Sequence, residues 1–126
     1  MDQNPPLPNF DPDHIKIYNI DLDRAHRLFV SKKAIFIDAR YPDDYITEHI
    51  PGSINLPNDM FDDFYPEVAH LFRIDDPLVI YCSGSGCDLS VLLADNLRYM
   101  GYEKLMLFEE GQPAWIAAGY PIKEGQ

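Results

Sequence analysis

The sequence has little positive charge and no long apolar stretch. Only 10 of its 126 residues are lysine or arginine, against 21 aspartates and glutamates, so the formal net charge is −11. Such a chain repels phosphate backbones and anionic membrane surfaces, which argues against nucleic acid as a partner. No segment approaches the roughly 18 consecutive apolar residues of a membrane span, and the start (MDQNPPLPNF) lacks the features of a signal peptide. We therefore expect a cytoplasmic protein without membrane contact.

Cysteine is also scarce. The two cysteines, Cys82 and Cys87, are separated by four residues in a Cys-x4-Cys pattern, and the four histidines are scattered along the chain. A metal site needs three or four ligands, so we expect no metal and no other cofactor. With 46% apolar residues, the chain can bury one core without disulfides. A structural disulfide would close a very short loop and would be opposed by a reducing cytosol, whereas a transient redox disulfide is an open alternative.

Four short segments have the pattern of β-strands. One alternates apolar and polar residues, as a half-buried strand does, and the other three are the short apolar runs typical of buried parallel strands. In chain order they are residues 14–18, 34–38, 78–82 and 104–108.

Helical patterns lie between these strands. Asp21 is a predicted N-cap for a helix that ends at Val30, and further helices are predicted over about residues 60–72 and 89–100. The alternation of strand and helix predicts an α/β fold. Residues 1–12 contain four prolines and are expected to form an extended N-terminal arm, which leaves residues 13–126 as one domain.

Both cysteines lie in one glycine-rich loop between a predicted strand and a predicted helix. The loop runs Cys82-Ser83-Gly84-Ser85-Gly86-Cys87-Asp88. An open α/β sheet places its ligand site at this position. The glycines permit backbone conformations that turn successive N–H groups toward one point, and the helix start adds partial positive charge. Helix N-termini lower cysteine pKa values, so a Cys82 thiolate is a candidate nucleophile, with a buried and inert thiol as the alternative.

Three segments, in this order, resemble the rhodanese family. The first comprises Asp38-Ala39-Arg40, Tyr45 and residues 48–57 (EHIPGSINLP), the second is the cysteine loop, and the third comprises residues 110–115 (EGQPAW) and 119–121 (GYP). The resemblance implies a single rhodanese-like domain with a central parallel five-stranded sheet flanked by helices on both faces. It also implies a sulfurtransferase whose cysteine takes sulfane sulfur from a donor, becomes a persulfide and passes the sulfur to a nucleophilic acceptor. Only Cys82 corresponds to that cysteine.

The other candidate residues are expected to support this chemistry. The family pattern suggests that Asp38 and Arg40 fix loops through hydrogen bonds and an ion pair. His49 is expected to order a turn through its ring nitrogens, and Trp115 to lie in the core or at the wall of the substrate pocket. The loop amides of residues 83–88 would hold the persulfide anion, so no side-chain base is required.

The cysteine loop departs from the family pattern at one position. Many active members have Cys-x4-Arg, and the arginine helps to hold an anionic donor such as thiosulfate. Here Cys87 takes that position, the loop has no Lys or Arg, and Asp88 adds a negative charge. We therefore expect thiosulfate to be a poor donor, and we rank cysteine phosphatase activity low for the same reason.

The second cysteine suggests a resolving role. Cys87 could attack the Cys82 persulfide, release sulfide and leave a disulfide that a thioredoxin-like reductant reopens. Two other functions stay open. A rhodanese-fold module without catalysis, which binds a protein partner or senses a ligand, would fit the missing arginine and the negative charge. A dithiol/disulfide redox protein would fit the cysteine pair.

Overall fold

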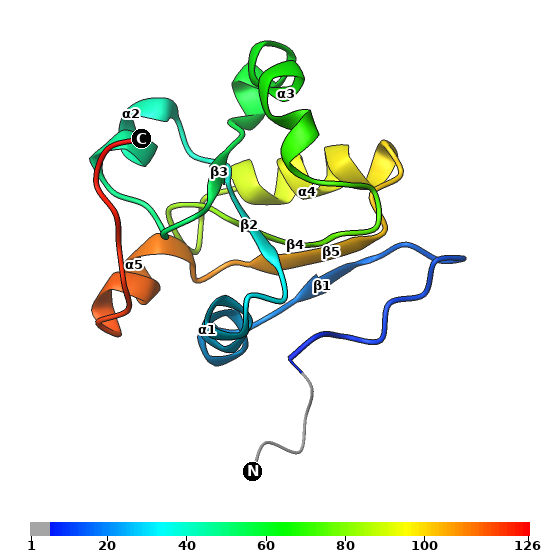
Figure 1. Ribbon diagram of the computed structural model, residues 1–126, viewed down its shortest axis with the longest axis horizontal. Coiled ribbons are helices and arrows are strands. Elements are labelled where there is room, and N and C mark those ends of the chain that lie inside the picture. Colours follow the sequence, from blue (N-terminus) through cyan, green and yellow to red (C-terminus); the bar gives the residue numbers. More distant parts are fainter. Residues whose placement is uncertain (1–5) are drawn as a thin grey trace.

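The computed structural model describes residues 6–126 and contains one five-stranded sheet in which all paired strands are parallel (Figure 1). The strand order is β1-β5-β4-β2-β3, so β4 occupies the centre. The strands are β1 (Ile17–Asn19), β2 (Ile35–Asp38), β3 (Ile54–Asn55), β4 (Pro77–Tyr81) and β5 (Lys104–Phe108). This is the α/β architecture with a parallel five-stranded sheet that the sequence and its resemblance predicted.

The helices fill the connections between the parallel strands. Their bounds are α1 (Leu22–Ser31), α2 (Pro42–Thr47), α3 (Phe61–Val68), α4 (Leu89–Tyr99) and α5 (Gly111–Ala117), with short 3-10 helices η1 (Asn58–Met60) and η2 (Ala69–Leu71). In the part of the chain that the structure describes, no helix has both the length and the apolar content needed to cross a membrane.

Both faces of the sheet are covered, as the resemblance implied. Leu78 and Ile80 of β4 pack in a cluster with side chains of α3 and α4, whereas Val79 and Tyr81 pack on the opposite face with α1 and α5. Figure 1 shows these two helix pairs on opposite sides of the sheet. Because alternate side chains of β4 point to opposite faces, its whole apolar run is buried, as the sequence pattern requires.

The predicted elements are correct in kind, with shifted ends. The Asp21 side chain caps α1 by accepting a hydrogen bond from the Arg24 amide (2.9 Å). The strand predicted over residues 14–18 begins later, at Ile17, because the chain up to His14 is in a turn closed on Asp11 (3.1 Å).

The helix predicted over residues 60–72 is also shorter than expected. α3 ends at Val68 and continues as the 3-10 helix η2. Pro66 within it has no backbone N–H, which removes one helical hydrogen bond. Residues 6–12 of the predicted arm contain no helix or strand, and Leu7 and Phe10 pack against the cluster beneath α1. Residues 1–5 of that arm lie outside the described residues.

Candidate functional site

The cysteine loop starts at the carboxyl end of the central strand. Cys82 directly follows β4 and is 1% exposed, and Asp88 directly precedes α4. Ser83, Ser85 and other residues of the loop between them are exposed, so the buried Cys82 lies beneath an accessible rim. This is the edge of a parallel α/β sheet where ligands bind.

Cys82 and Cys87 are joined by a disulfide. Their Cα atoms are 6.4 Å apart, and the Cys87 amide donates to the Gly84 carbonyl oxygen (3.0 Å), which folds the loop back on itself. Gly84 and Gly86 have φ values of +117° and +90°, in a region that side-chain-bearing residues rarely adopt. The two glycines therefore permit the turn that brings the second cysteine to the first. The pair that the sequence left as a transient redox alternative is bonded in this structure.

The turn after β5 and the first residues of α5 support the cysteine loop through their backbone. The Gln112 amide donates to the Cys82 carbonyl oxygen (3.0 Å). Gly111 packs so tightly that a Cβ there would lie 2.8 Å from the Gly84 nitrogen, and its own φ is +64°. A Cβ on Gly84 would lie 3.4 Å from the Glu110 carbonyl oxygen. The sequence pointed to this segment only as a family motif, because a backbone-to-backbone contact leaves no residue pattern beyond the glycine itself.

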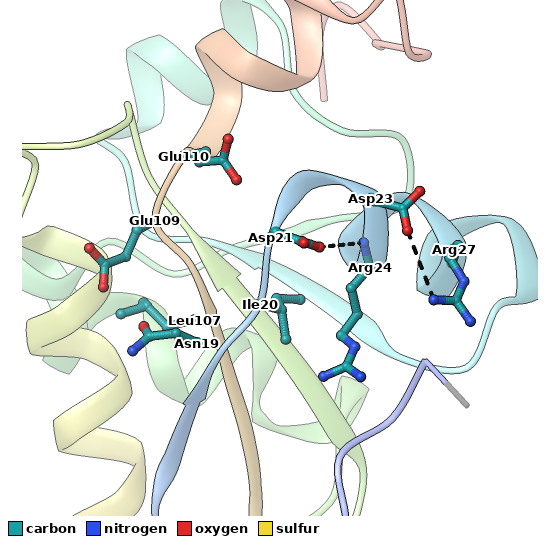
Figure 2. A pocket seen from close by; sticks show the side chains of 9 residues that line it. All are labelled: Asn19, Ile20, Asp21, Asp23, Arg24, Arg27, Leu107, Glu109 and Glu110. Atoms are coloured by element: carbon teal, nitrogen blue, oxygen red, sulfur yellow. Dashed lines mark hydrogen bonds and ion pairs between the residues drawn. The ribbon is translucent and has the colours of Figure 1, made fainter. Parts of the chain in front are cut away.

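Glu110 connects the same turn to α1. Its Oε1 accepts a hydrogen bond from the Leu22 amide at the start of that helix (3.0 Å). An open pocket of about 600 Å³ lies here, with Glu109 and Glu110 on one side and Asp21 and Arg24 on the other (Figure 2). The carboxylate of Glu110 thus satisfies one of the free N–H groups at the helix start and anchors the turn beneath the cysteine loop.

The Asp38–Arg40 pair lies beside the site as a buried ion pair. Arg40 Nη2 is 2.8 Å from Asp38 Oδ2 and donates to the Glu48 carbonyl oxygen (2.7 Å). Burial by itself would lower the pKa of Arg40, but the hydrogen bond and the charge of Asp38 outweigh it and raise that pKa above its ordinary value. Arg40 therefore stays charged and holds the segment around Glu48, a geometry that suits the supporting role expected of the pair.

Gln112 extends this buried polar chain to Cys82. Its Nε2 donates to the Glu48 carbonyl oxygen (3.2 Å), the same oxygen that accepts a hydrogen bond from Arg40. Its main-chain amide donates to the Cys82 carbonyl oxygen. Among the described residues, its Oε1 is buried without a hydrogen-bond partner. The local sequence pattern assigns Gln112 no role, because its contacts are with residues 30 and 64 positions away in the chain.

His49 and Trp115 make their hydrogen bonds and ring contacts with residues other than the two cysteines. His49 Nδ1 bonds the Tyr45 carbonyl oxygen (2.7 Å), its ring stacks on that of Tyr45 (3.7 Å between centroids), and its backbone pairs with Lys123. Trp115 is 0% exposed and donates from Nε1 to the Pro121 carbonyl oxygen (2.7 Å). Of the two positions expected for Trp115, the core is the one in which the structure places it, packed among aromatic neighbours such as Phe29 and Tyr120.

The charged side chains around Tyr41, at the start of α2, are the carboxylates of Asp59 and Asp88. The Tyr41 hydroxyl donates to Asp59 Oδ2 (2.6 Å). The hydrogen bond and charge of Asp59 raise the pKa of the Tyr41 phenol, and Asp88 adds to the shift, which places both carboxylates near this ring. Within residues 6–126, no group of three or more His, Cys, Asp or Glu side chains is arranged to hold a metal ion.

Comparisons with known proteins identify the family of this chain. A family model described as a rhodanese-like domain matches residues 21–118. The uncharacterized protein YibN of Escherichia coli K12 is 30% identical over 112 residues, which cover 88% of this chain and 76% of YibN. Thiosulfate sulfurtransferase 16 of Arabidopsis thaliana is 24% identical over 83% of this chain and 92% of its own length. The solved structure of thiosulfate sulfurtransferase from Pseudomonas aeruginosa aligns with a TM-score of 0.71 at 24% identity, over 87% of this chain and 21% of that one.

Proposed function

Since the chain belongs to the rhodanese-like domain family, we propose that it is a sulfurtransferase that moves sulfane sulfur through a persulfide on Cys82. The observation that carries the proposal is the position of Cys82, buried at the carboxyl end of the central strand in a loop that precedes α4. Similarity to thiosulfate sulfurtransferases supports the reaction class. The acceptor is a thiol or another nucleophile.

The disulfide makes reduction the first step. Cys82 and Cys87 are bonded, so neither sulfur is a nucleophile until a dithiol supplies two electrons and two protons. The dithiol becomes a disulfide and the protein gains two thiols. A thioredoxin-like reductant fits this step, and a reducing compartment such as the cytoplasm supplies it.

Transfer then follows as covalent catalysis. The Cys82 thiolate attacks the terminal sulfur of a donor persulfide, the donor leaves as a thiolate, and Cys82 carries the persulfide anion. An acceptor thiolate attacks the outer sulfur of this persulfide, which returns Cys82 to its thiolate. The amides of residues 83–88 and the start of α4 are the groups proposed to hold the anionic sulfur, since this loop has no Lys or Arg.

Cys87 gives the persulfide a second outcome. Its thiolate attacks the inner sulfur, Cys82 Sγ, and the outer sulfur leaves as sulfide. The product is the Cys82–Cys87 disulfide, which is the state found in the structure. Thiosulfate is a poor donor in this scheme, because Asp88 and Asp59 oppose the approach of a dianion.

Mass spectrometry tests the proposal. The protein is reduced, freed of reductant and incubated separately with glutathione persulfide, inorganic polysulfide and thiosulfate. In the Cys87→Ser variant, which cannot release the sulfur through the second thiol, we expect a gain of about 32 Da, one sulfur, on the peptide that contains Cys82, with glutathione persulfide and not with thiosulfate. The Cys82→Ser/Cys87→Ser variant is the control and should gain nothing. If reduced Cys87→Ser protein takes sulfur from none of the three donors, sulfur transfer is excluded and a non-catalytic binding or sensing module becomes the better explanation.

The disulfide favours a second candidate, a dithiol/disulfide redox protein. Equilibration with glutathione buffers measures its reduction potential. A potential within the range of cytosolic dithiol proteins, together with disulfide reduction of a partner and no persulfide, would select this function over sulfur transfer.

A further inference from the structure

A groove of about 700 Å³ lies between α2, α3 and the edge strand β3. Apolar side chains from both helices and from η2 line it, among them Ile46, Phe64, Val68 and Leu71. Ile46 and Leu71 are 43% and 50% exposed. Figure 1 shows α2 and α3 on the side of the molecule where β3 forms the edge of the sheet, and no strand within residues 6–126 lies beyond β3.

The rim of this groove is acidic. Asp63 and Glu67 line it, and Asp63 also lines the adjoining hollow that contains Asp59. Residues 41–72 include seven acidic residues and no lysine or arginine. Six of these acidic residues are exposed: Asp43, Asp44, Asp59, Asp62, Asp63 and Glu67. Arg73 follows this segment, and Lys123 pairs through its backbone with His49 after α2.

The acidic surface continues toward the cysteine loop. Asp59 accepts a hydrogen bond from the Tyr41 hydroxyl. The charge of Asp88, the last residue before α4, also contributes to the raised pKa of Tyr41. Negative charge therefore extends from the groove, through Asp59 in the adjoining hollow, to Tyr41 at the start of α2.

We propose that this groove is the docking surface for a protein partner that presents a basic segment with apolar side chains. The apolar floor excludes water from the partner's apolar side chains, and the carboxylates of the rim pair with its lysines and arginines. A second copy of this chain fits poorly, because two chains of net charge −11 would bring their acidic rims together. Anionic lipid and nucleic acid are disfavoured for the same reason. As the delivery route of a sulfur donor or acceptor, the groove deepens the proposed function and rests on it.

A peptide-binding experiment tests the surface without requiring sulfur transfer. The probe is a fluorescein-labelled 14-residue peptide of two LKKLLKL repeats, and the protein carries Cys82→Ser so that no persulfide forms. Fluorescence anisotropy gives the affinity. The Ile46→Ser/Leu71→Ser variant removes the floor, and the Asp63→Asn/Glu67→Gln variant removes the rim charge. Val30→Ser, at a 63% exposed apolar site on α1, and Asp75→Asn/Glu103→Gln are the matched controls.

We expect each groove variant to weaken peptide binding by about tenfold or more, and each control to change it less than about twofold. If Asp63→Asn/Glu67→Gln and its control Asp75→Asn/Glu103→Gln weaken peptide binding equally, the peptide is attracted by the general negative charge of the protein, and the proposal is overturned. Equally tight binding of a peptide in which serine replaces every leucine would also overturn it. A dimer in sedimentation that Ile46→Ser/Leu71→Ser dissociates would assign the groove to a second copy and also overturn it.

The two proposals can fail separately. Failure of persulfide formation in the mass measurement, with specific peptide binding retained, leaves a docking module. Persulfide formation without groove-dependent binding leaves a sulfurtransferase whose partners approach elsewhere.

Discussion

Gly111 lies directly against the carbonyl oxygen of Cys82. A side chain at this position would collide with that oxygen and would come within 2.8 Å of the Gly84 nitrogen. The next residue, Gln112, donates its amide to the same carbonyl (3.0 Å). The turn after β5 therefore sets the position of the cysteine loop through backbone contacts, and these contacts require that residue 111 has no side chain.

Gly111→Ala should displace the cysteine loop and destabilise the protein. The new Cβ meets backbone atoms that cannot rotate away, and φ of +64° is unfavourable for alanine, so we expect a loss of about 3 kcal/mol. Urea denaturation measures this. Persulfide formation at Cys82 should slow by about tenfold. Gly119→Ala is the matched control, because Gly119 has φ of +77° with open space around it; its loss should be about 1 kcal/mol without change in rate. Equal effects at both positions would refute a steric role for Gly111.

Arg40→Met should be strongly destabilising. It leaves the Asp38 carboxylate, 0% exposed, without its counter-charge, and the Glu48 carbonyl oxygen without one donor, at a cost of about 3–5 kcal/mol. The control is Arg98→Met, which breaks an exposed pair with Asp95 and should cost less than about 1 kcal/mol.

Removing both charges of the buried pair should be milder than removing one. Asp38→Leu/Arg40→Met should therefore recover part of the stability lost in Arg40→Met, as measured by denaturation at pH 7. A double variant that is less stable than the single one by the full cost of a second buried substitution would show that the ion pair is not the origin of the effect.

The stability of the protein should fall at alkaline pH, in part through Tyr81. Burial, and then the charge of Asp38, raise the pKa of this phenol well above 10. Above pH 10 the unfolded chain loses the phenol proton while the folded chain keeps it, so the folded state binds more protons. The free energy of unfolding then decreases as pH rises, by up to about 1.4 kcal/mol per pH unit for one group. Below pH 10 this contribution is fully present.

Tyr81→Phe should make the alkaline decline less steep. Part of the decline should remain in this variant, because burial and the hydrogen bond with Tyr65 also raise the pKa of Tyr102. At pH 7 the variant should lose about 1–3 kcal/mol, since the Ile50 amide and Ser53 hydroxyl lose their partner. Tyr99→Phe, at a 91% exposed position, should change neither quantity. Urea denaturation between pH 8 and 11 follows all three proteins; identical slopes would show that Tyr81 does not contribute.

Cys87→Ser should slow sulfide release and prolong the Cys82 persulfide. Without the second thiol the intramolecular attack that displaces sulfide is lost and only slower attack by the added dithiol reductant remains, so the rate of release should fall by about tenfold or more. Methylene blue assay measures sulfide, and mass spectrometry follows the persulfide. Ser85→Ala, an exposed change in the same loop, is the control and should behave as wild type. Unchanged sulfide release in Cys87→Ser would exclude the resolving role.

Local sequence patterns located four of the five strands of the sheet. The runs that became β2, β4 and β5 are apolar at their buried positions except at Asp38, which ends β2, and a strand buried on both faces requires such a run. The short elements α2, β3 and α5 could not be assigned from periodicity, because two to seven residues give too few repeats to distinguish a helix from a turn.

The same division applies to the site. The sequence by itself determined that both cysteines share a glycine-rich loop after an apolar strand, since these features are contiguous in the chain. Only the tertiary structure decided that Cys82 is buried and bonded to Cys87, that Gly111 and Gln112 hold its carbonyl, and that α2 and α3 enclose an acidic groove. Those contacts join residues far apart in the chain, and they depend on how closely two backbones pack, which no local pattern of residue types encodes.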